Sequence, residues 1–224
     1  MTTRRGKFIT IEGLDGCGKS TQLERLAAAL RKQGLTVVTT REPGGTAIGE
    51  NVRAVLLDSR TAGLDPWAEL ALMFAARAQH IAEVIRPALD HGKFVLCDRF
   101  TDSSEAYQGG GRKLGSEPVL ALHRTLCGNL QPDLTILMDS EVAASVERAR
   151  RRNQQKGVTV DENRFESESR AFFGRVRDKY LEIAKREPQR VVVVNARKQA
   201  DPVSEEILGL VRERLLKSAT GARR

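Results

Sequence analysis

Five short runs of apolar and β-branched residues recur along the chain, each separated from the next by a segment long enough for a helix. They are Phe8–Glu12, Val37–Thr40, Phe94–Cys97, Leu134–Met138 and Val191–Val194. Their apolar character is continuous rather than alternating, which is typical of strands buried on both faces of a parallel sheet. The pattern therefore predicts an α/β sandwich, with helices covering a parallel sheet.

Between these runs, apolar residues recur three and four positions apart, as they do on one face of a helix. The first such pattern contains Leu23, Leu26 and Leu30 and stops at Gly34, a residue typical of helix ends. Beyond it, the glycines 109–111 predict a turn that approaches another part of the chain closely. The further helices we expect span Asp65–Ala88, Glu117–Cys127, Arg164–Lys185 and a last segment from Asp201 onward.

Length and composition favour one globular domain. At 224 residues, with 40% hydrophobic and 29% charged residues and no low-complexity linker, we expect one domain over residues 1–217 and a disordered tail over 218–224. No apolar run approaches the roughly 18 residues that a membrane span needs, and the N-terminal stretch lacks the apolar segment of a secretory signal. These features predict a cytoplasmic protein with no membrane partner.

The cysteines and the net charge narrow the possible functions. Cys17, Cys97 and Cys127 show no C-x-x-C spacing, which suits a reducing compartment and disfavours a disulfide framework or a zinc site. His123 and Cys127 lie four residues apart, but two ligands without a third are usually packing residues. The charge of +8 indicates polyanionic partners, and aromatic residues at 4% are few for a surface that stacks on single-stranded nucleic acid. A nucleotide is thus favoured over a nucleic acid.

The strongest motif is EGLDGCGKST at residues 12–21, which follows the first predicted strand and opens the first helix. It satisfies G-x-x-x-x-G-K-[ST], in which backbone N–H groups surround phosphate oxygens, Lys19 reaches the β- and γ-phosphates and Ser20 ligates Mg²⁺. We therefore expect bound ATP and Mg²⁺. The residues expected to contact ATP here are Gly13, Leu14, Asp15, Gly16, Cys17, Gly18, Lys19, Ser20 and Thr21.

Two further segments lie where predicted strands end, which is where open parallel sheets place ligands. Asp98 is suited to hold the metal through water and to orient Lys19, and Arg99 enters the same crevice, although such a pair can simply cap a strand. The turn TREPGGT, which contains Pro43, ends the second strand and is followed by Arg53.

An arginine run, 148–152, precedes a polar segment that ends at Arg164. Such a run is often a solvated face or a nucleic-acid patch. It also fits a short mobile lid over about residues 148–164, whose guanidinium groups stabilise charge on the transferring phosphoryl group. From this run we expect Arg148 to bind the nucleotide and Arg152 to take part in catalysis.

Taken together, EGLDGCGKST, TREPGGT, DRFTDSSEAYQGGGR and the arginine-rich lid resemble the bacterial thymidylate kinases, P-loop nucleoside monophosphate kinases, in family order from Glu12 to about Arg170. The resemblance implies a P-loop NTPase three-layer sandwich with a five-stranded parallel sheet, ATP-dependent phosphorylation of dTMP to dTDP, and a homodimer. An acceptor that is already an anionic phosphate needs no general base, so no catalytic histidine is expected.

The same resemblance assigns roles to individual residues. It places Asp15 near the acceptor's 3′-hydroxyl and the metal, Arg99 on the acceptor phosphate, Arg77 on a thymine carbonyl and Tyr107 beneath the deoxyribose. Further acceptor contacts implied are Pro43, Arg53, Ser104 and Gln108, and Asn195 and Arg197 are expected near adenine.

Two positions depart from the family pattern. The family often has phenylalanine stacked on thymine four residues before the arginine of this helix, where this chain has Met73, with Phe74 next to it; we expect Phe74 or Met73 to stack. Gly16 stands where some family members carry arginine, so the lid must supply that charge.

Two other functions compete with this interpretation. The first is a kinase of another nucleoside monophosphate on the same fold, which the signature DRFTDSSEAYQGGGR disfavours. The second is a P-loop nucleic-acid-binding or regulatory protein, supported only by the net charge and the arginine run.

Overall fold

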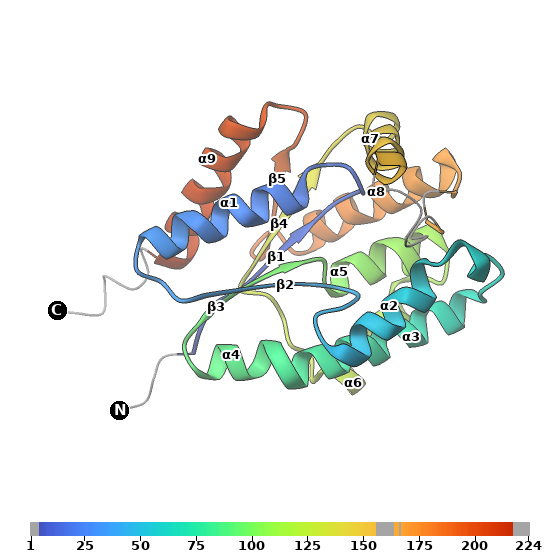
Figure 1. Cartoon of the computed structure of the whole chain (residues 1–224), viewed down its shortest axis with the longest axis horizontal. Helices are drawn as coiled ribbons and strands as arrows, with labels where there is room; N and C mark the ends of the chain where they lie inside the picture. The colour runs from blue at the N-terminus through green and yellow to red at the C-terminus, as the bar shows by residue number, and fades with distance from the viewer. Residues whose placement is uncertain (1–4, 156–163, 166, 217–224) are drawn as a thin grey trace.

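The computed structural model describes residues 5–155, 164–165 and 167–216, and within them the predicted parallel sheet is present (Figure 1). Its five strands run in the order β2-β3-β1-β4-β5, and every neighbouring pair is parallel. The strands are β1 (Phe8–Glu12), β2 (Val37–Arg41), β3 (Phe94–Asp98), β4 (Leu134–Asp139) and β5 (Val191–Asn195). The α/β sandwich with a five-stranded parallel sheet is confirmed.

Helical segments connect these strands and cover both faces of the sheet (Figure 1). They are α1 (Lys19–Lys32), α2 (Ala47–Leu57), η1 (Ser59–Thr61), α3 (Pro66–His80), η2 (Ile81–Ile85), α4 (Arg86–Asp90), α5 (Thr101–Ser104), η3 (Glu105–Gly111), α6 (Ser116–Cys127), α7 (Val142–Gln155), α8 (Arg170–Arg186), α9 (Ala200–Val211) and η4 (Arg212–Leu216). None of the described helices is long and apolar enough to cross a membrane.

Successive side chains of each strand enter different cores because strand residues alternate between faces. In β1, Ile9 and Ile11 pack with α1 and α9 on one face, while Phe8 packs with α3, α4 and α6 on the other. On that second face, Leu137 of β4 belongs to a third cluster built mainly from α8. The mainly apolar and β-branched strand sequences thus follow from burial on both sides.

The strand order places the candidate site. From β1 the chain first builds β3 and β2 on one side and then crosses to β4 and β5 on the other, so β1 lies at the point where the winding reverses. In such sheets, ligands bind at the carboxyl ends of the strands beside this point. The phosphate loop that follows β1 lies there, and Asp98 at the end of β3 is its neighbour, because Ile11 and Asp98 are paired in register.

Two predicted helices have different bounds in the structure. The helix expected over Asp65–Ala88 is divided by the π-helical turn η2, which directly precedes α4 with its Pro87, where a proline has no N–H to continue the ladder. The helix expected from Arg164 begins only at Arg170, because Ser169 caps it by accepting a hydrogen bond from the backbone N–H of Phe172.

The glycines 109–111 do not form the expected turn but belong to the π-helical segment η3. The expected close approach is present: a Cβ on Gly111 would lie 2.5 Å from the ring of Phe172, and one on Gly110 would lie 2.7 Å from Lys179 Cβ. Glycine is therefore needed here so that η3 can pack against α8. The tail expected to be disordered, 218–224, lies outside the described residues.

Candidate active site

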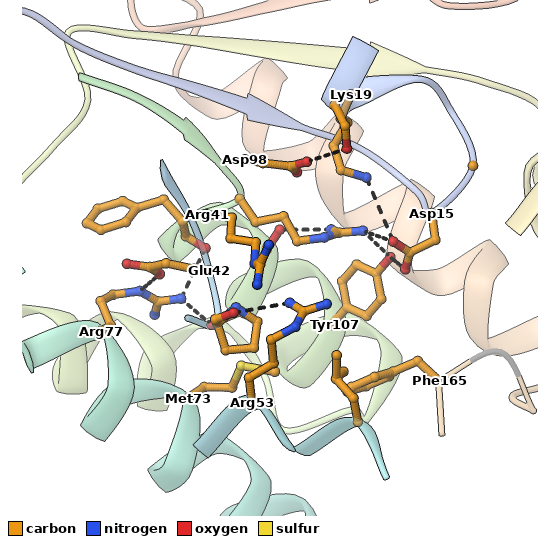
Figure 2. Close-up of a pocket in the computed structure, with 18 of the residues that line it drawn as sticks. Asp15, Lys19, Arg41, Glu42, Arg53, Met73, Arg77, Asp98, Tyr107 and Phe165 are labelled. Carbon is orange, nitrogen blue, oxygen red and sulfur yellow. Dashed lines mark hydrogen bonds and ion pairs between the residues drawn. The ribbon is translucent and has the colours of Figure 1, made fainter. Parts of the chain in front are cut away.

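A cavity of about 560 Å³ opens at the carboxyl edge of the sheet. Its wall combines the phosphate loop, the ends of β2 and β3, and side chains from α2, α3, α7 and η3. Lys19 and Asp15 lie at one end of it and Arg77 lies at the other (Figure 2). The volume is in the range of small-molecule sites, and the arrangement separates a phosphate-binding end from a second, more enclosed end.

At the phosphate-loop end, Lys19 is held by the loop itself. Its Nζ donates to the carbonyl oxygens of Gly13 at 3.2 Å and Leu14 at 2.9 Å. The expectation that Asp98 orients this lysine is therefore wrong, because the loop carbonyls are the hydrogen-bond acceptors. Helix α1 begins directly after Gly18, whose φ of 99° and missing side-chain cap leave the first helical N–H groups open toward an anion.

Ser20 and Asp98 form a pair of oxygen donors beside this loop. The Ser20 hydroxyl donates to Asp98 Oδ2 at 3.1 Å, while Asp98 Oδ1 is buried and has no hydrogen-bond partner among the described residues. Hydroxyl and carboxylate oxygens are the ligands that Mg²⁺ prefers, and Mg²⁺ is usually held by few protein ligands together with substrate phosphates. The donor set therefore fits Mg²⁺. In the described ranges no three His, Cys, Asp or Glu residues form a metal-binding group.

Arg99 forms the middle of the site. Its NH2 donates to Asp15 Oδ1 at 2.8 Å and to the Tyr107 hydroxyl at 3.1 Å, and its NH1 donates to Ser103 Oγ and the Tyr180 hydroxyl. The residue has a φ of 73°, a conformation that few non-glycine residues adopt. Burial raises the pKa of Tyr107, so its hydroxyl stays protonated and neutral beside the cavity.

Beneath Arg99 lies a carboxyl group that the sequence interpretation did not include. Glu12, at the end of β1, is fully buried and accepts hydrogen bonds from the backbone N–H of Phe100 and from the hydroxyls of Ser103 and Tyr180. Burial raises its pKa to about 7. The hydroxyls of Ser103 and Tyr180 also contact Arg99, so Glu12 holds in place two of the groups that position the Arg99 guanidinium. The sequence feature that could have indicated this residue is a glutamate at the end of a mainly apolar predicted strand.

At the opposite end of the cavity, Arg77 extends from α3 between several acceptors. Its Nε donates to Glu42 Oε2 at 2.7 Å and its NH2 donates to Ser104 Oγ at 2.9 Å. Behind it, His80 Nδ1 lies 2.9 Å from the other oxygen of Glu42, and together these contacts hold the carboxylate. Arg77 NH1 is buried and has no partner in the described part of the chain, although the residue lines the cavity. One strong donor is thus left for a ligand.

The structure decides between the two neighbouring residues of α3 at this end. Phe74 is fully buried in the core, with the Arg77 guanidinium 4.7 Å from its ring centroid, and it is not part of the cavity wall. Met73 lines the cavity instead, as Figure 2 shows. The assignment of Phe74 to the acceptor is corrected, because one step along a helix turns a side chain by about 100°.

The thymidylate kinase family profile matches residues 11–207 of the chain. The chain belongs to the thymidylate kinase family. It is 50% identical over 196 residues to thymidylate kinase of Desulfovibrio desulfuricans (88% of this chain, 90% of the relative) and 46% identical over 217 residues to that of Pelobacter propionicus (97% and 99%). A crystal structure of thymidylate kinase from Ehrlichia chaffeensis aligns with a TM-score of 0.73 at 33% identity, covering 93% of this chain and 99% of that one. The P-loop NTPase fold is thereby confirmed.

In this thymidylate kinase fold, α7 brings one lid arginine to the phosphate loop. Arg148 lines the cavity, and its Nε donates to the carbonyl oxygen of Gly16 at 2.8 Å. A Cβ on Gly16 would lie 2.3 Å from the carbonyl oxygen of Ser145, so α7 can pack here only against glycine. Arg152 belongs to α7, but its side chain lies outside the description, as do residues 156–163 of the predicted lid.

The arginine at the other end of the predicted lid does not line the cavity. Arg164 is buried, its NH1 pairs with Glu69 at 2.7 Å, and its backbone N–H donates to the carbonyl oxygen of Leu57. Arg164, which ends the polar segment in the sequence, is therefore bound by a buried carboxylate and is not part of the cavity wall. Next to it, Phe165 does line the cavity and packs edge-on against Tyr107.

Most of the remaining sequence-predicted residues line the cavity, but some do not. Those in its wall are Asp15, Gly16, Gly18, Lys19, Ser20, Thr21, Pro43, Arg53, Arg77, Asp98, Arg99, Ser104, Tyr107, Gln108 and Arg148. Leu14 and Cys17 are buried and lie outside this wall, as does Gly13. Asn195 is the last residue of β5 and Arg197 lies two residues beyond it. Asn195 Oδ1 accepts from the Arg197 backbone N–H, and both residues lie outside the cavity.

The cavity also contains residues that the sequence interpretation missed. Arg41 ends β2 and Glu42 follows it at the carboxyl edge of the sheet, so the argument that selected Asp98 applies equally to them. Leu57 and Phe165 also line the cavity, and no sequence pattern distinguishes them from core residues.

Proposed function

We propose that this protein transfers the γ-phosphoryl group of ATP to dTMP, giving dTDP and ADP, with Mg²⁺ bound at Ser20 and, through water, at Asp98. The observation that carries the proposal is one cavity with a phosphate loop at one end and, at the other, the buried NH1 of Arg77, which has no partner among the described residues. This arrangement suits a donor triphosphate that meets an acceptor whose base lies at the far end. Family membership supports the same reaction.

The proposed mechanism is positioning and charge neutralisation. Two polyanions must approach in line, and the acceptor phosphate oxygen is already a nucleophile, so no base has to remove a proton. Lys19 is assigned to the β- and γ-phosphates, Arg99 to the acceptor phosphate, and the lid arginines Arg148 and Arg152 to the transferring group. Asp15 accepts a hydrogen bond from Arg99 and is assigned to the 3′-hydroxyl of the acceptor. When held by Ser20 and Asp98, Mg²⁺ would supply further neutralisation of the phosphate charge.

Base selection is assigned to the enclosed end. Arg77 NH1 offers a donor, and Gln108 Oε1, which is buried and unpartnered among the described residues, offers an acceptor. Thymine carries an acceptor, O4, next to a donor, N3–H, so the two edges are complementary. Met73 is assigned to the face of the base and Tyr107 to the deoxyribose, which leaves no room for a 2′-hydroxyl.

Further contacts complete the proposed site. The Ser104 hydroxyl binds Arg77 and is assigned to the edge of the base. Arg53 donates to the carbonyl oxygen of Pro43, and both residues line the cavity, which supports a role near the acceptor phosphate. Asn195 and Arg197 are assigned to the adenine ring at the end of β5.

A panel of monophosphates tests the reaction. We expect ADP release with ATP and Mg²⁺ to be fastest with dTMP and roughly 10- to 200-fold lower in kcat/KM with dUMP, because one methyl group contributes about 1 to 3 kcal/mol. The ribose counterpart of dTMP should be slower still, because the 2′-hydroxyl clashes with Tyr107. A preference for AMP, GMP or dCMP would leave the phosphate-loop chemistry standing and reject the assigned acceptor. Equal rates for dTMP and its ribose counterpart would reject the role of Tyr107.

Metal dependence tests the oxygen pair beside the loop. Chelation of Mg²⁺ should abolish turnover, and Asp98→Asn should raise the Mg²⁺ concentration for half-maximal rate by roughly 10- to 100-fold, since the variant loses a charged oxygen. Asp90→Asn, at an exposed position of α4, is the matched control and should behave as the wild type. An unchanged Mg²⁺ requirement in Asp98→Asn would remove Asp98 from the metal site.

A homodimer is proposed from the family resemblance and from exposed apolar side chains. Ile48 and Val55 of α2 and Trp67 at the start of α3 are 53%, 45% and 54% exposed, and α2 packs against α3. Such residues on two adjoining helices favour an isologous contact. Sedimentation at micromolar concentration should give twice the chain mass, and a monomer at all concentrations would reject the dimer.

We propose the cytoplasm as the location, with no nucleic-acid partner. Cys17, Cys97 and Cys127 are all buried and unbridged, as suits a reducing compartment. Five arginines contribute to the cavity wall, so bound nucleotides account for a large share of the positive charge. Binding to DNA or RNA that weakens steeply with salt would favour the competing function instead.

A further inference from the structure

The enclosed end of the cavity depends on an acidic residue that does not line it. Glu69 of α3 is fully buried, and its Oε1 accepts a hydrogen bond from Gln108 Nε2 at 2.7 Å. Its Oε2 accepts from Arg112 NH2 at 3.1 Å and from Arg164 NH1 at 2.7 Å. Every one of these partners is a donor, so both oxygens of Glu69 must act as acceptors.

This environment fixes the orientation of the Gln108 amide. A glutamine amide has a donor side and an acceptor side, and which side faces a neighbour is decided by that neighbour's chemistry. Because Glu69 only accepts, the NH₂ group of Gln108 must face it, and Oε1 is turned to the other side. Gln108 lines the cavity and is 1% exposed, and its Oε1 has no partner among the described residues.

We propose that Glu69 is a positioning residue that determines base specificity: it holds Gln108 so that an acceptor, not a donor, faces the base. This inference rests on the proposed function. With Arg77 NH1 as the neighbouring donor, the cavity then matches bases with an imide edge, as in thymine and uracil. Cytosine presents the reverse pattern, an amino donor at N4 and an acceptor at N3, and would oppose both groups.

The cluster itself suggests the substitution that tests this. In Glu69→Gln, the two guanidinium groups can only donate, so they take the amide oxygen of the new side chain. Its NH₂ group is then left facing position 108. The Gln108 amide must turn to accept from it and must offer its own NH₂ group to the base.

We expect Glu69→Gln to raise the KM for dTMP at least tenfold with a smaller change in kcat. The ratio of kcat/KM for dTMP to that for dCMP should fall at least tenfold. The matched control is Arg112→Gln, which removes one ion pair from the same carboxylate but leaves Glu69 to orient Gln108. Its thermal stability should fall while its dTMP to dCMP ratio stays within threefold of the wild type.

The double variant Glu69→Gln with Gln108→Glu exchanges the acid and the amide and keeps the charge of the cluster. The carboxylate at position 108 accepts from the new amide and again presents an oxygen to the base, so the dTMP to dCMP ratio should return to within threefold of the wild type. If the single variant Glu69→Gln does not fold, the double variant alone tests the proposal. A dTMP to dCMP ratio of kcat/KM that falls more than threefold below the wild-type value in the double variant would then overturn it.

Two other outcomes are decisive. An unchanged ratio in Glu69→Gln, or an equal fall in Arg112→Gln, would show that Glu69 contributes to stability only and would overturn the proposal. Wild-type protein that does not phosphorylate dTMP would reject the proposed function before any variant is compared, so the two failures are distinguishable.

Discussion

Replacing Lys19 by alanine should lower kcat by roughly 10²- to 10³-fold, a loss of about 2.7 to 4 kcal/mol in transition-state stabilisation, as for the removal of one preorganised donor to developing charge. Lys19 is 6% exposed and is held by two carbonyl oxygens of the loop, so its ammonium group is already in place before ATP binds. Steady-state kinetics at saturating ATP and dTMP, with thermal unfolding in parallel, measure the effect.

The fold should survive this substitution. The ammonium group's bonded partners are backbone carbonyls, and the nearest carboxylate, Asp15 at 3.9 Å, keeps its shorter pair with Arg99. No buried charge is left without a counter-charge. Lys32→Ala, at an exposed position near the end of the same helix, is the control and should retain wild-type kcat. A kcat within threefold of wild type in Lys19→Ala would remove this lysine from the mechanism.

Replacing Arg99 by alanine should lower kcat/KM for dTMP by roughly 10²- to 10³-fold, or about 3 to 4 kcal/mol, because a desolvated charge pair with the acceptor phosphate is lost. The KM for ATP should change by less than about threefold, since the donor site is formed by the phosphate loop. Initial-rate measurements with each substrate varied in turn separate the two effects.

Arg99→Lys is the informative companion variant. It keeps the charge but cannot reach Asp15, Ser103 and both tyrosines at once, as the guanidinium fork does. We expect it to recover less than a tenth of the lost kcat/KM. Full recovery would show that a point charge suffices and that the fork geometry is incidental, and an equal loss for both substrates would place Arg99 at the donor instead.

The predictable part of this structure is the part encoded locally. Each strand follows from a run of four or five apolar residues, and the phosphate loop follows from glycines and a lysine at fixed spacing between a strand and a helix. Asp98 and Arg99 were found because position at a strand's carboxyl end is itself readable from sequence. The buried acids Glu12 and Glu69 could not be found in this way.

Those acids depend on partners that only packing brings together. Glu69 meets Gln108 across 39 positions of sequence. Glu12 meets Tyr180 across 168 positions. From the sequence alone, a glutamate is expected at the surface because it is charged. Whether it can be buried depends on how many hydrogen-bond donors surround it in the folded protein, and the sequence does not show these donors. The ion pair between Arg164 and Glu69 could not be predicted for the same reason, because the polar residues around Arg164 in the sequence give no sign of the carboxylate that binds it.

The choice between Met73 and Phe74 shows a different limit. The two residues are adjacent and both apolar, so composition cannot separate them, and only the rotation of α3 about its axis decides which one faces the cavity. That rotation is set by Leu70 and Phe74 packing into the core together.

The contact between α7 and the phosphate loop constrains how this enzyme can diverge from its relatives. A side chain at position 16 would meet the carbonyl oxygen of Ser145 at 2.3 Å and the amide nitrogen of Ala149 at 2.9 Å. A relative with arginine at that position would need more space between this helix and the loop than the present structure has. Gly16→Arg alone would therefore displace α7 or the phosphate loop in this chain, so accepting an arginine at this position also requires changes elsewhere in the helix or the loop.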